Sequence, residues 1–228
     1  MRYLGGKTKI SKHIVPIMES YRLDNQAWVE PFVGGCNTII KVDGVRYAND
    51  IRADLITLWE KATYSGYIPP TTVTRDTFNL IKDNPSAYPA ELRSFVSIGC
   101  SFSGIEWGSY ANDKTERNYA AEASRGVVRK ADKMRGVTFS SGSYDAMYIP
   151  PSSLIYCDPP YEGTVGYSNP FNHALFWDWC RSKAREGHTV FISEYNAPSD
   201  FIEVWSKDVK STVSRVGKPA VERLFKAV

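Results

Sequence analysis

The sequence predicts an α/β protein in which a mostly parallel sheet ends in an antiparallel hairpin and carries a helical insertion. A short strand over 26–29 leads into a glycine turn and a helical segment over 37–42. A second strand over 45–48 precedes a helix over 51–62, and an apolar strand over 154–157 stops at two consecutive prolines. Strands that alternate with helices are typical of parallel α/β sheets.

Composition bounds the class of protein. The chain has 228 residues, 43% hydrophobic content and a net charge of +3. It is long enough for one sizeable core, and its charge is too small to indicate a nucleic-acid partner by itself. The absence of a long apolar run or signal-peptide core predicts a cytoplasmic protein without a membrane partner. Scattered cysteines without a C-x-x-C pair predict free thiols in a reducing compartment, with neither a disulfide framework nor a zinc site: Cys36, Cys100, Cys157 and Cys180.

A stiff corner follows the strand Leu154–Cys157. Two prolines fix their own φ angles and lack N–H donors, so no sheet ladder continues through them. The corner holds the Asp158 carboxylate, the Pro159 carbonyl and the Tyr161 ring at a strand's C-terminal end, where open α/β sheets place ligands. Two fixed acceptors would suit the exocyclic amine of a nucleobase, and the ring would stack on the base. A plain Pro-Pro turn with a solvated aspartate is the alternative.

Two N-terminal features predict a nucleoside site. Gly34-Gly35 lies between a strand and a helical segment, an arrangement that brings backbone N–H groups to a ligand. Asp50 ends the second strand and suits the hydroxyls of a ribose, although it could also cap the following helix. Tyr3 and Lys7 flank a further Gly-Gly turn in a segment that would otherwise be a frayed terminus.

The middle section, 63–135, differs in character and predicts a helical insertion. Prolines punctuate short helices over 74–82 and 90–100, and a basic helix follows over 116–134. Arg125, Arg129 and Lys133 recur at four-residue spacing in this helix and therefore share a face: either a solvated face or a phosphate-contacting one.

The C-terminal part predicts strands around one helix. The helix over 173–186 begins after Asn172, a good N-cap, and is expected to bury Leu175 among other apolar residues. The remaining predicted strands cover 137–140, 189–193, 207–216 and 221–228, the last two joined near Gly217-Lys218-Pro219.

The motifs resemble, in order, those of the DNA N6-adenine methyltransferases that include GATC-methylating enzymes. The resemblance covers residues 1–62 and 136–228, and its motifs are Tyr3-Leu4-Gly5-Gly6-Lys7, Glu30-Pro31-Phe32-Val33-Gly34-Gly35, Asn49-Asp50, Asp158-Pro159-Pro160-Tyr161 and Val221-Glu222-Arg223-Leu224-Phe225.

This resemblance implies a Rossmann-like methyltransferase sheet over 1–62 and 136–228, with target recognition in 63–135. It implies transfer of a methyl group from S-adenosyl-L-methionine to adenine N6 without a metal. Asp158, the Pro159 carbonyl and Tyr161 would orient a flipped adenine. The implied cofactor contacts are Tyr3, Lys7, Phe32, Gly34, Asp50, Asp145 and Asp158.

Double-stranded DNA is the implied partner, contacted by Arg125, Arg129 and Lys133, with a role in restriction–modification and a monomeric or weakly dimeric state. The alternatives are another acceptor, such as cytosine N4 or an RNA adenine, or a catalytically impaired DNA-binding relative. Cys36 occupies a place where this family usually has glycine, and its side chain is expected to crowd the methionine part of the cofactor.

Overall fold

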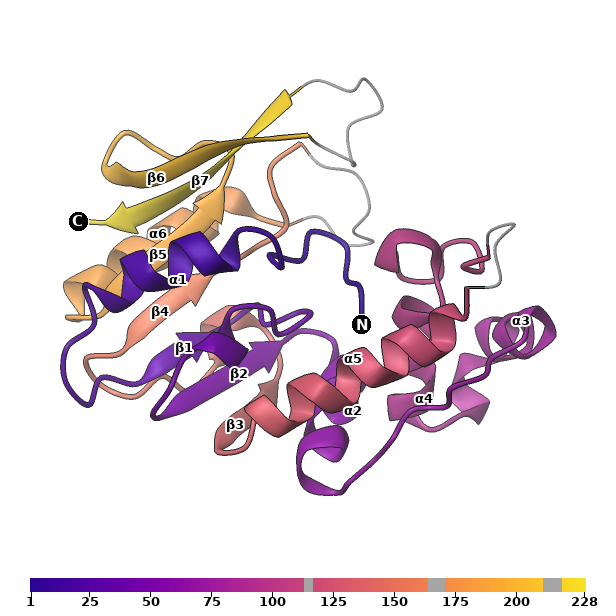
Figure 1. Ribbon diagram of the computed structural model, residues 1–228. Helices are drawn as coiled ribbons and strands as arrows, with labels where there is room; N and C mark the ends of the chain where they lie inside the picture. The colour runs from indigo at the N-terminus through magenta and orange to yellow at the C-terminus, as the bar shows by residue number, and fades with distance from the viewer. Residues whose placement is uncertain (113–116, 164–170, 211–218) are drawn as a thin grey trace.

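A computed structural model describes residues 1–112, 117–163, 171–210 and 219–228 (Figure 1). In these residues the strands form one sheet in the order β3-β2-β1-β4-β5-β7-β6. The first five of these pair in parallel, whereas β7 runs antiparallel to both β5 and β6. The strands are β1 (Trp28–Glu30), β2 (Arg46–Asp50), β3 (Val137–Ser141), β4 (Leu154–Cys157), β5 (Thr189–Glu194), β6 (Phe201–Lys210) and β7 (Pro219–Ala227).

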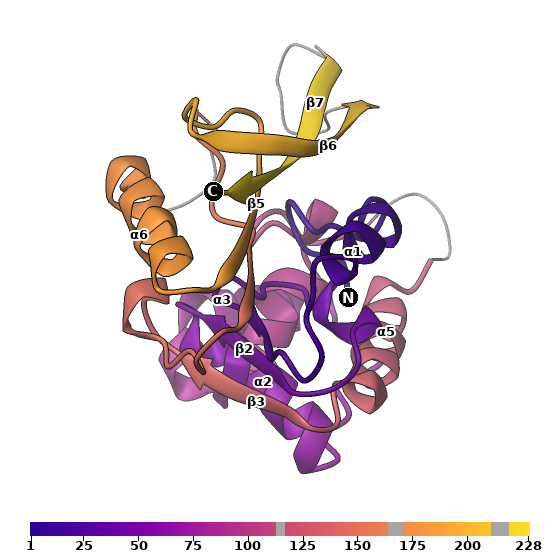
Figure 2. The ribbon, with the colours of Figure 1, turned by 90° about the vertical axis from the view of Figure 1, so that its left-hand side faces the viewer.

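Helices cover both faces of the sheet, with α1 and α5 on one side and α6 on the other (Figure 2). Apolar side chains of α1, α2 and α5 share one buried cluster, and those of α6 belong to a second. Trp28 of β1 packs in the first cluster and its neighbour Val29 in the second, as the alternation of side chains along a strand requires. The α-helices are α1 (Ser11–Glu19), α2 (Ala53–Tyr64), α3 (Arg75–Asp83), α4 (Ala90–Ser94), α5 (Tyr119–Lys133) and α6 (His173–Arg185).

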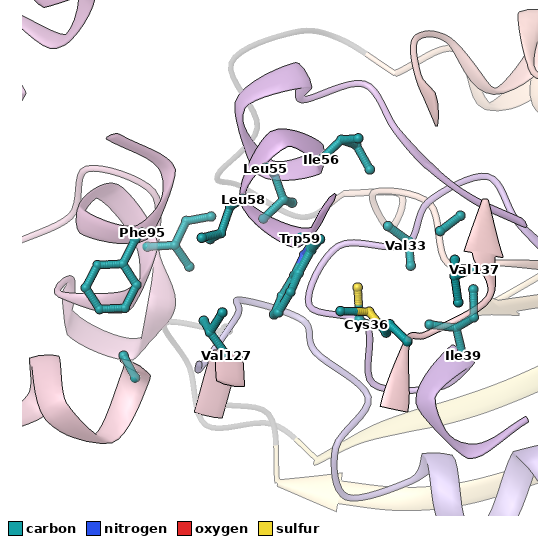
Figure 3. Close-up of a cluster of buried hydrophobic side chains, with 14 of the residues drawn as sticks. Val33, Cys36, Ile39, Leu55, Ile56, Leu58, Trp59, Phe95, Val127 and Val137 are labelled. Carbon is teal, nitrogen blue, oxygen red and sulfur yellow. The ribbon is translucent and has the colours of Figure 1, made fainter. Parts of the chain in front are cut away.

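The middle section packs directly on the sheet domain. Phe95 after α4 and Val127 of α5 belong to the same buried cluster as Trp59 of α2 (Figure 3). Phe78 of α3 also belongs to this cluster. The predicted insertion over 63–135 is therefore helical and shares the main core, while its role in target recognition stays a prediction.

The predicted Rossmann-like α/β sheet with antiparallel C-terminal strands is confirmed. The strand Leu154–Cys157 has its predicted bounds. The side chain of Asn172 caps α6 by accepting from the Leu175 amide at 3.1 Å. Within the described residues, no helix is both long and apolar enough to cross a membrane.

Several local predictions were wrong. The segment 37–42 forms only a 3₁₀ turn, Ile39–Lys41. The predicted helical piece over 90–100 is present, as α4 followed by a π-helical stretch, Phe95–Gly99. Strand β6 begins at Phe201, ahead of the predicted 207, because its residues pair with β7 as an edge strand. Leu175 is 62% exposed, because the buried side of α6 is formed by Phe176, Trp177 and Cys180. The predicted turn at 217–218 and the helix start at 116 lie outside the described residues.

Cys36 takes an unusual backbone conformation in the turn after β1. Its φ of 52° lies in the left-handed region that favours glycine. The side chain is fully buried and lies among Val33, Ile39 and Trp59 in the core (Figure 3). The expectation that it crowds a ligand at the turn is therefore wrong, because the turn directs the thiol inward. Burial raises the pKa of this thiol well above its usual value.

Replacing Cys36 by Gly is expected to destabilise the protein scarcely more than replacing it by Ala. Loss of a buried Cβ and added chain entropy cost about 1–2 kcal/mol, but glycine relieves about 1–2 kcal/mol of left-handed strain. The buried Cys100, at φ −100°, is the matched control, where Gly should be less stable than Ala by the full cost. Urea unfolding of all four variants measures both differences; equal Ala-to-Gly losses at the two positions would contradict the strain argument.

Candidate active site

The sheet topology brings the predicted motifs to one edge. Strand β1 lies between β2 and β4, so the sheet order reverses direction between β1 and β4. Ligands of open α/β sheets bind outside the carboxyl ends of the strands at such a switch point. The glycine turn after β1 and the Pro-Pro corner after β4 meet there, and Asp50 ends the neighbouring β2.

Lys7 from the N-terminal loop pairs with Asp158 at this edge. Its ammonium lies 2.7 Å from Asp158 Oδ1 and donates to the Gly5 carbonyl at 3.1 Å. The Lys7 side chain is only 7% exposed and that of Asp158 21%. A charge pair removed from water in this way is costly to break from one side only, so each partner fixes the other.

Tyr161 completes the corner through contacts with other elements. The Lys7 ammonium lies 4.5 Å from the centroid of its ring. The Tyr161 hydroxyl donates to Glu222 Oε2 of β7 at 2.8 Å. The Tyr195 ring, just after β5, packs nearly perpendicular to it with a centroid distance of 4.7 Å. The ring is therefore held by the N-terminal loop, β7 and the end of β5.

The electrostatics of the corner are strongly perturbed. Burial raises the pKa of Asp158 to about 6, against the opposing effect of the Lys7 charge, and Glu222 adds to the rise. Burial lowers the pKa of Lys7, but Asp158 and Glu222 outweigh it, and the net shift is upward. At neutral pH the site therefore holds an ionised Asp158 beside a charged Lys7. Coupled, perturbed groups of this kind cluster at functional sites.

Tyr3 covers the glycine turn. A Cβ on Gly34 would meet ring carbon Cε1 of Tyr3 at 2.9 Å, and one on Gly35 would meet Tyr3 Cβ at 2.8 Å. The Gly34 amide donates to Asp50 Oδ2 at 2.9 Å, and the Arg52 amide donates to Oδ1 at 3.1 Å. Asp50 therefore ties β2 to the turn and does not sit at the N-cap of α2, which is Arg52.

Phe32 belongs to an aromatic cluster that includes Tyr144, the residue next to Asp145 in the chain. The ring of Phe32 stacks on Tyr144 at a centroid distance of 5.3 Å, and both rings contact Phe171 and Phe176. Asp145 is exposed and accepts a hydrogen bond from the Ser143 hydroxyl. Phe32 therefore lies in an aromatic environment. Asp145 is near it because the preceding residue, Tyr144, stacks on the Phe32 ring.

The basic helix α5 is joined to the glycine turn by its inner face. Lys130 donates to the Gly35 carbonyl and to Asn37 Oδ1, the latter at 2.7 Å, and burial lowers its pKa to about 8. Arg125, Arg129 and Lys133 are all exposed, which is compatible with both interpretations of this face.

Sequence reasoning assigned no role to several residues of this edge: Lys130, Glu194 and Glu222. Glu194 is 2% exposed and accepts from the amides of Tyr195 at 2.7 Å and Glu162 at 3.1 Å, which anchors the chain after Tyr161 to β5. Burial raises its pKa to about 7. Glu194 ends an apolar strand, as Asp50 does, and this position in the sequence could have indicated a residue of the site. Glu222 contacts Tyr161, and Lys130 contacts Gly35, from elements far away in the sequence. Neither residue follows an apolar strand, so its sequence position did not indicate a place at the site.

Comparison with known proteins supports the predicted resemblance. Residues 3–92 match the family model described as D12 class N6 adenine-specific DNA methyltransferase. The chain is 25% identical over 231 residues to the retron Ec67 DNA adenine methylase of Escherichia coli, covering 85% of this chain and 75% of that protein. The resemblance to N6-adenine-specific DNA methyltransferases is thereby confirmed.

Solved structures resemble the chain only loosely. An rRNA methylase from Streptococcus thermophilus is 9% identical, covers 96% of this chain and 97% of its own, and has a TM-score of 0.42. SMU.472 complexed with SAH is 11% identical with a TM-score of 0.38, and the match spans 97% of this chain but 53% of that one. At such scores the fold assignment follows from the strand order of the chain itself.

Gly34→Ala is expected to destabilise the fold more than Gly136→Ala. Both glycines have positive φ, 44° and 82°, so each substitution costs about 1 kcal/mol of backbone strain. Only at Gly34 would the new Cβ collide with Tyr3, whereas nothing lies within 4 Å at Gly136. Urea unfolding compares the two variants; equal losses of stability would show that the Tyr3 contact is unimportant.

Proposed function

We propose, from its match to the D12 class of N6-adenine-specific DNA methyltransferases, that this chain methylates adenine N6 at specific sites in DNA. The methyl donor would be S-adenosyl-L-methionine, and the target base would leave the duplex to reach the site. One observation carries the proposal: Asp158 and Tyr161 lie at the sheet's switch point beside the glycine turn, in a network built on the buried Lys7.

The corner is suited to orienting an exocyclic amine. The lone pair of adenine N6 is delocalised into the ring, so the amine needs fixed acceptors to direct it. Lys7 holds Asp158 Oδ1, and we assign Oδ2 and the Pro159 carbonyl to accept from N6. Such preorganised acceptors also stabilise the positive charge that develops on nitrogen during transfer. Tyr161 would stack on the flipped base, offsetting part of the few kcal/mol that unstacking costs.

The edge also offers groups that fit the donor. Asp50 is buried at the end of β2, and each of its oxygens already accepts one amide, which leaves acceptor capacity for ribose hydroxyls. Phe32 would line an apolar wall, Asp145 would contribute a weaker polar contact, and Gly34 permits close approach of the backbone. Tyr3 and Lys7 would close over the bound molecule. When bound, the donor supplies a methyl group on a positively charged sulfur.

Two alternatives remain as outcomes of the test. Another acceptor, cytosine N4 or an RNA adenine, would present a similar amine to Asp158. For a catalytically impaired relative, Cys36 was the sequence feature in favour, and its burial in the core removes that support.

The wild-type protein, incubated with DNA and labelled S-adenosylmethionine, is expected to produce N6-methyladenine, and Asp158→Ala is expected to abolish the transfer. The carboxylate is the acceptor that orients N6, so its removal should reduce the rate by at least about 100-fold. Mass spectrometry of digested nucleosides identifies the base, and circular dichroism checks the fold of the variant. Labelled N4-methylcytosine, or full activity of Asp158→Ala, would refute this assignment.

Neutralising Arg125 or Arg129 is expected to weaken DNA binding and to flatten its salt dependence. Removing one phosphate-binding charge should lower the slope of log K against log salt by about 1. Arg185→Gln is the control, since this exposed arginine lies on α6, across the sheet from α5 (Figure 2). Fluorescence anisotropy with labelled duplex at several salt concentrations measures the slopes. Unchanged slopes for Arg125→Gln and Arg129→Gln would show that this face of α5 is merely solvated.

A further inference from the structure

We infer that Glu222 of β7 is a positioning residue, whose carboxylate fixes the ring of Tyr161 for stacking on the target base. The inference rests on the proposed function and extends it to the C-terminal strand pair. It assigns a role in the reaction to a strand whose contribution would otherwise be to complete the sheet.

The geometry connects Glu222 to the reacting corner directly. Glu222 Oε2 accepts from the Tyr161 hydroxyl at 2.8 Å. Two residues along β7, on the same face, Leu224 is fully buried in the main core. The backbone of β7 is thus anchored by Leu224, and Glu222 projects from this anchored strand into the site. A carboxylate on a rigid element defines the position of the Tyr161 hydroxyl better than a loop side chain would.

The charge of Glu222 argues against a purely structural role. It lies close enough to the site to raise the pKa values of Asp158, Tyr161 and Lys7. A second carboxylate near the buried Asp158 is unfavourable, and a neutral acceptor would hold the tyrosine without this cost. Arrangements that cost stability persist at functional sites when the function requires them. Lys7, which pairs with Asp158 and lies against the Tyr161 ring, offsets the repulsion.

The next residue of β7 supports the same ring from another direction. Arg223, on the opposite face of the strand, donates to the Tyr195 carbonyl and pairs with Glu203 of β6 at 2.9 Å. Tyr195 in turn packs its ring against Tyr161. Consecutive residues of β7 therefore fix Tyr161 through its hydroxyl and through its aromatic neighbour.

A double-mutant cycle on the full chain tests the inference, with Glu222→Ala, Tyr161→Phe and the double variant. Each single substitution is expected to lower kcat by about 10- to 100-fold, the range for a hydrogen bond to a charged group. The kcat of the double variant should be no lower than that of the worse single variant, because Glu222 acts through the tyrosine hydroxyl. KM for S-adenosylmethionine should change by less than about threefold, since Glu222 is not assigned to the donor.

Conservative and control variants sharpen the comparison. Glu222→Gln keeps an oxygen acceptor but loses the charge that strengthens the hydrogen bond, so it is expected to restore only part of the kcat that Glu222→Ala removes. Asp208→Asn removes an exposed carboxylate on β6, opposite Val221 in the ladder, and should leave kcat unchanged. Additive reductions in kcat, or no rescue by Gln, would overturn the positioning role.

The same cycle measured by urea unfolding separates this inference from the proposed function. Coupling between Glu222 and Tyr161 in stability reports their hydrogen bond whether or not the protein methylates DNA. Its absence would overturn the inference even if the wild type is active. If the wild type does not methylate DNA but the stability coupling is present, the proposed function fails, and with it the positioning role of Glu222 in the reaction, while the hydrogen bond itself stands.

Discussion

The buried ion pair between Lys7 and Asp158 is the interaction on which the rest of the site depends. It joins the N-terminal loop to the end of β4, segments far apart in the chain, at 2.7 Å. Because both groups are largely withdrawn from water, neither can lose its partner cheaply, and the loop is held against the sheet edge. The position of Tyr161, against Lys7 on one side and Glu222 on another, follows from this pair. The order of the strands allows the N-terminal loop and the corner after β4 to come together, because β4 lies next to β1 and its glycine turn.

The residues that meet at the candidate site were easier to predict from the sequence than the contacts between them. Strand β4 and the corner after it are encoded locally, by an apolar run that two prolines stop, so both bounds and candidate residues could be placed. The same holds for the cap of α6 by Asn172. The hydrogen bond from Tyr161 to Glu222 could not be found in this way, because it depends on the antiparallel register of β7 against β5. The early start of β6 was missed for a related reason, since that strand gains its pairing only from β7.

Cys36 shows how a backbone angle can reverse an expectation based on residue type. At a glycine position, a larger side chain was expected to project toward the ligand. The positive φ of 52° instead turns the Cβ inward, where the thiol fills space beside Trp59. The indole N–H of Trp59 donates to the Gly34 carbonyl at 2.9 Å, so the core beneath the turn also fixes its path. Lys130 of α5 holds the next carbonyl, that of Gly35. The turn is thus supported from below by packing and from α5 by the half-buried ammonium of Lys130.

The balance of charge at the sheet edge agrees with the proposed reaction. Asp158, Glu194 and Glu222 gather at the ends of β4, β5 and β7, and Lys7 is the buried cation among them. Burial raises the pKa of both Asp158 and Glu194, which means that the folded chain bears a cost for keeping them ionised. A positively charged methyl donor and an amine that becomes cationic during transfer would both reduce that cost. Fixed carboxylates aimed at developing positive charge need no reorganisation as the reaction proceeds. The acid-rich edge is therefore better suited to transfer of a methyl group from a cationic donor to nitrogen than to stabilising an oxyanion. This property comes from several strands together and from no single residue.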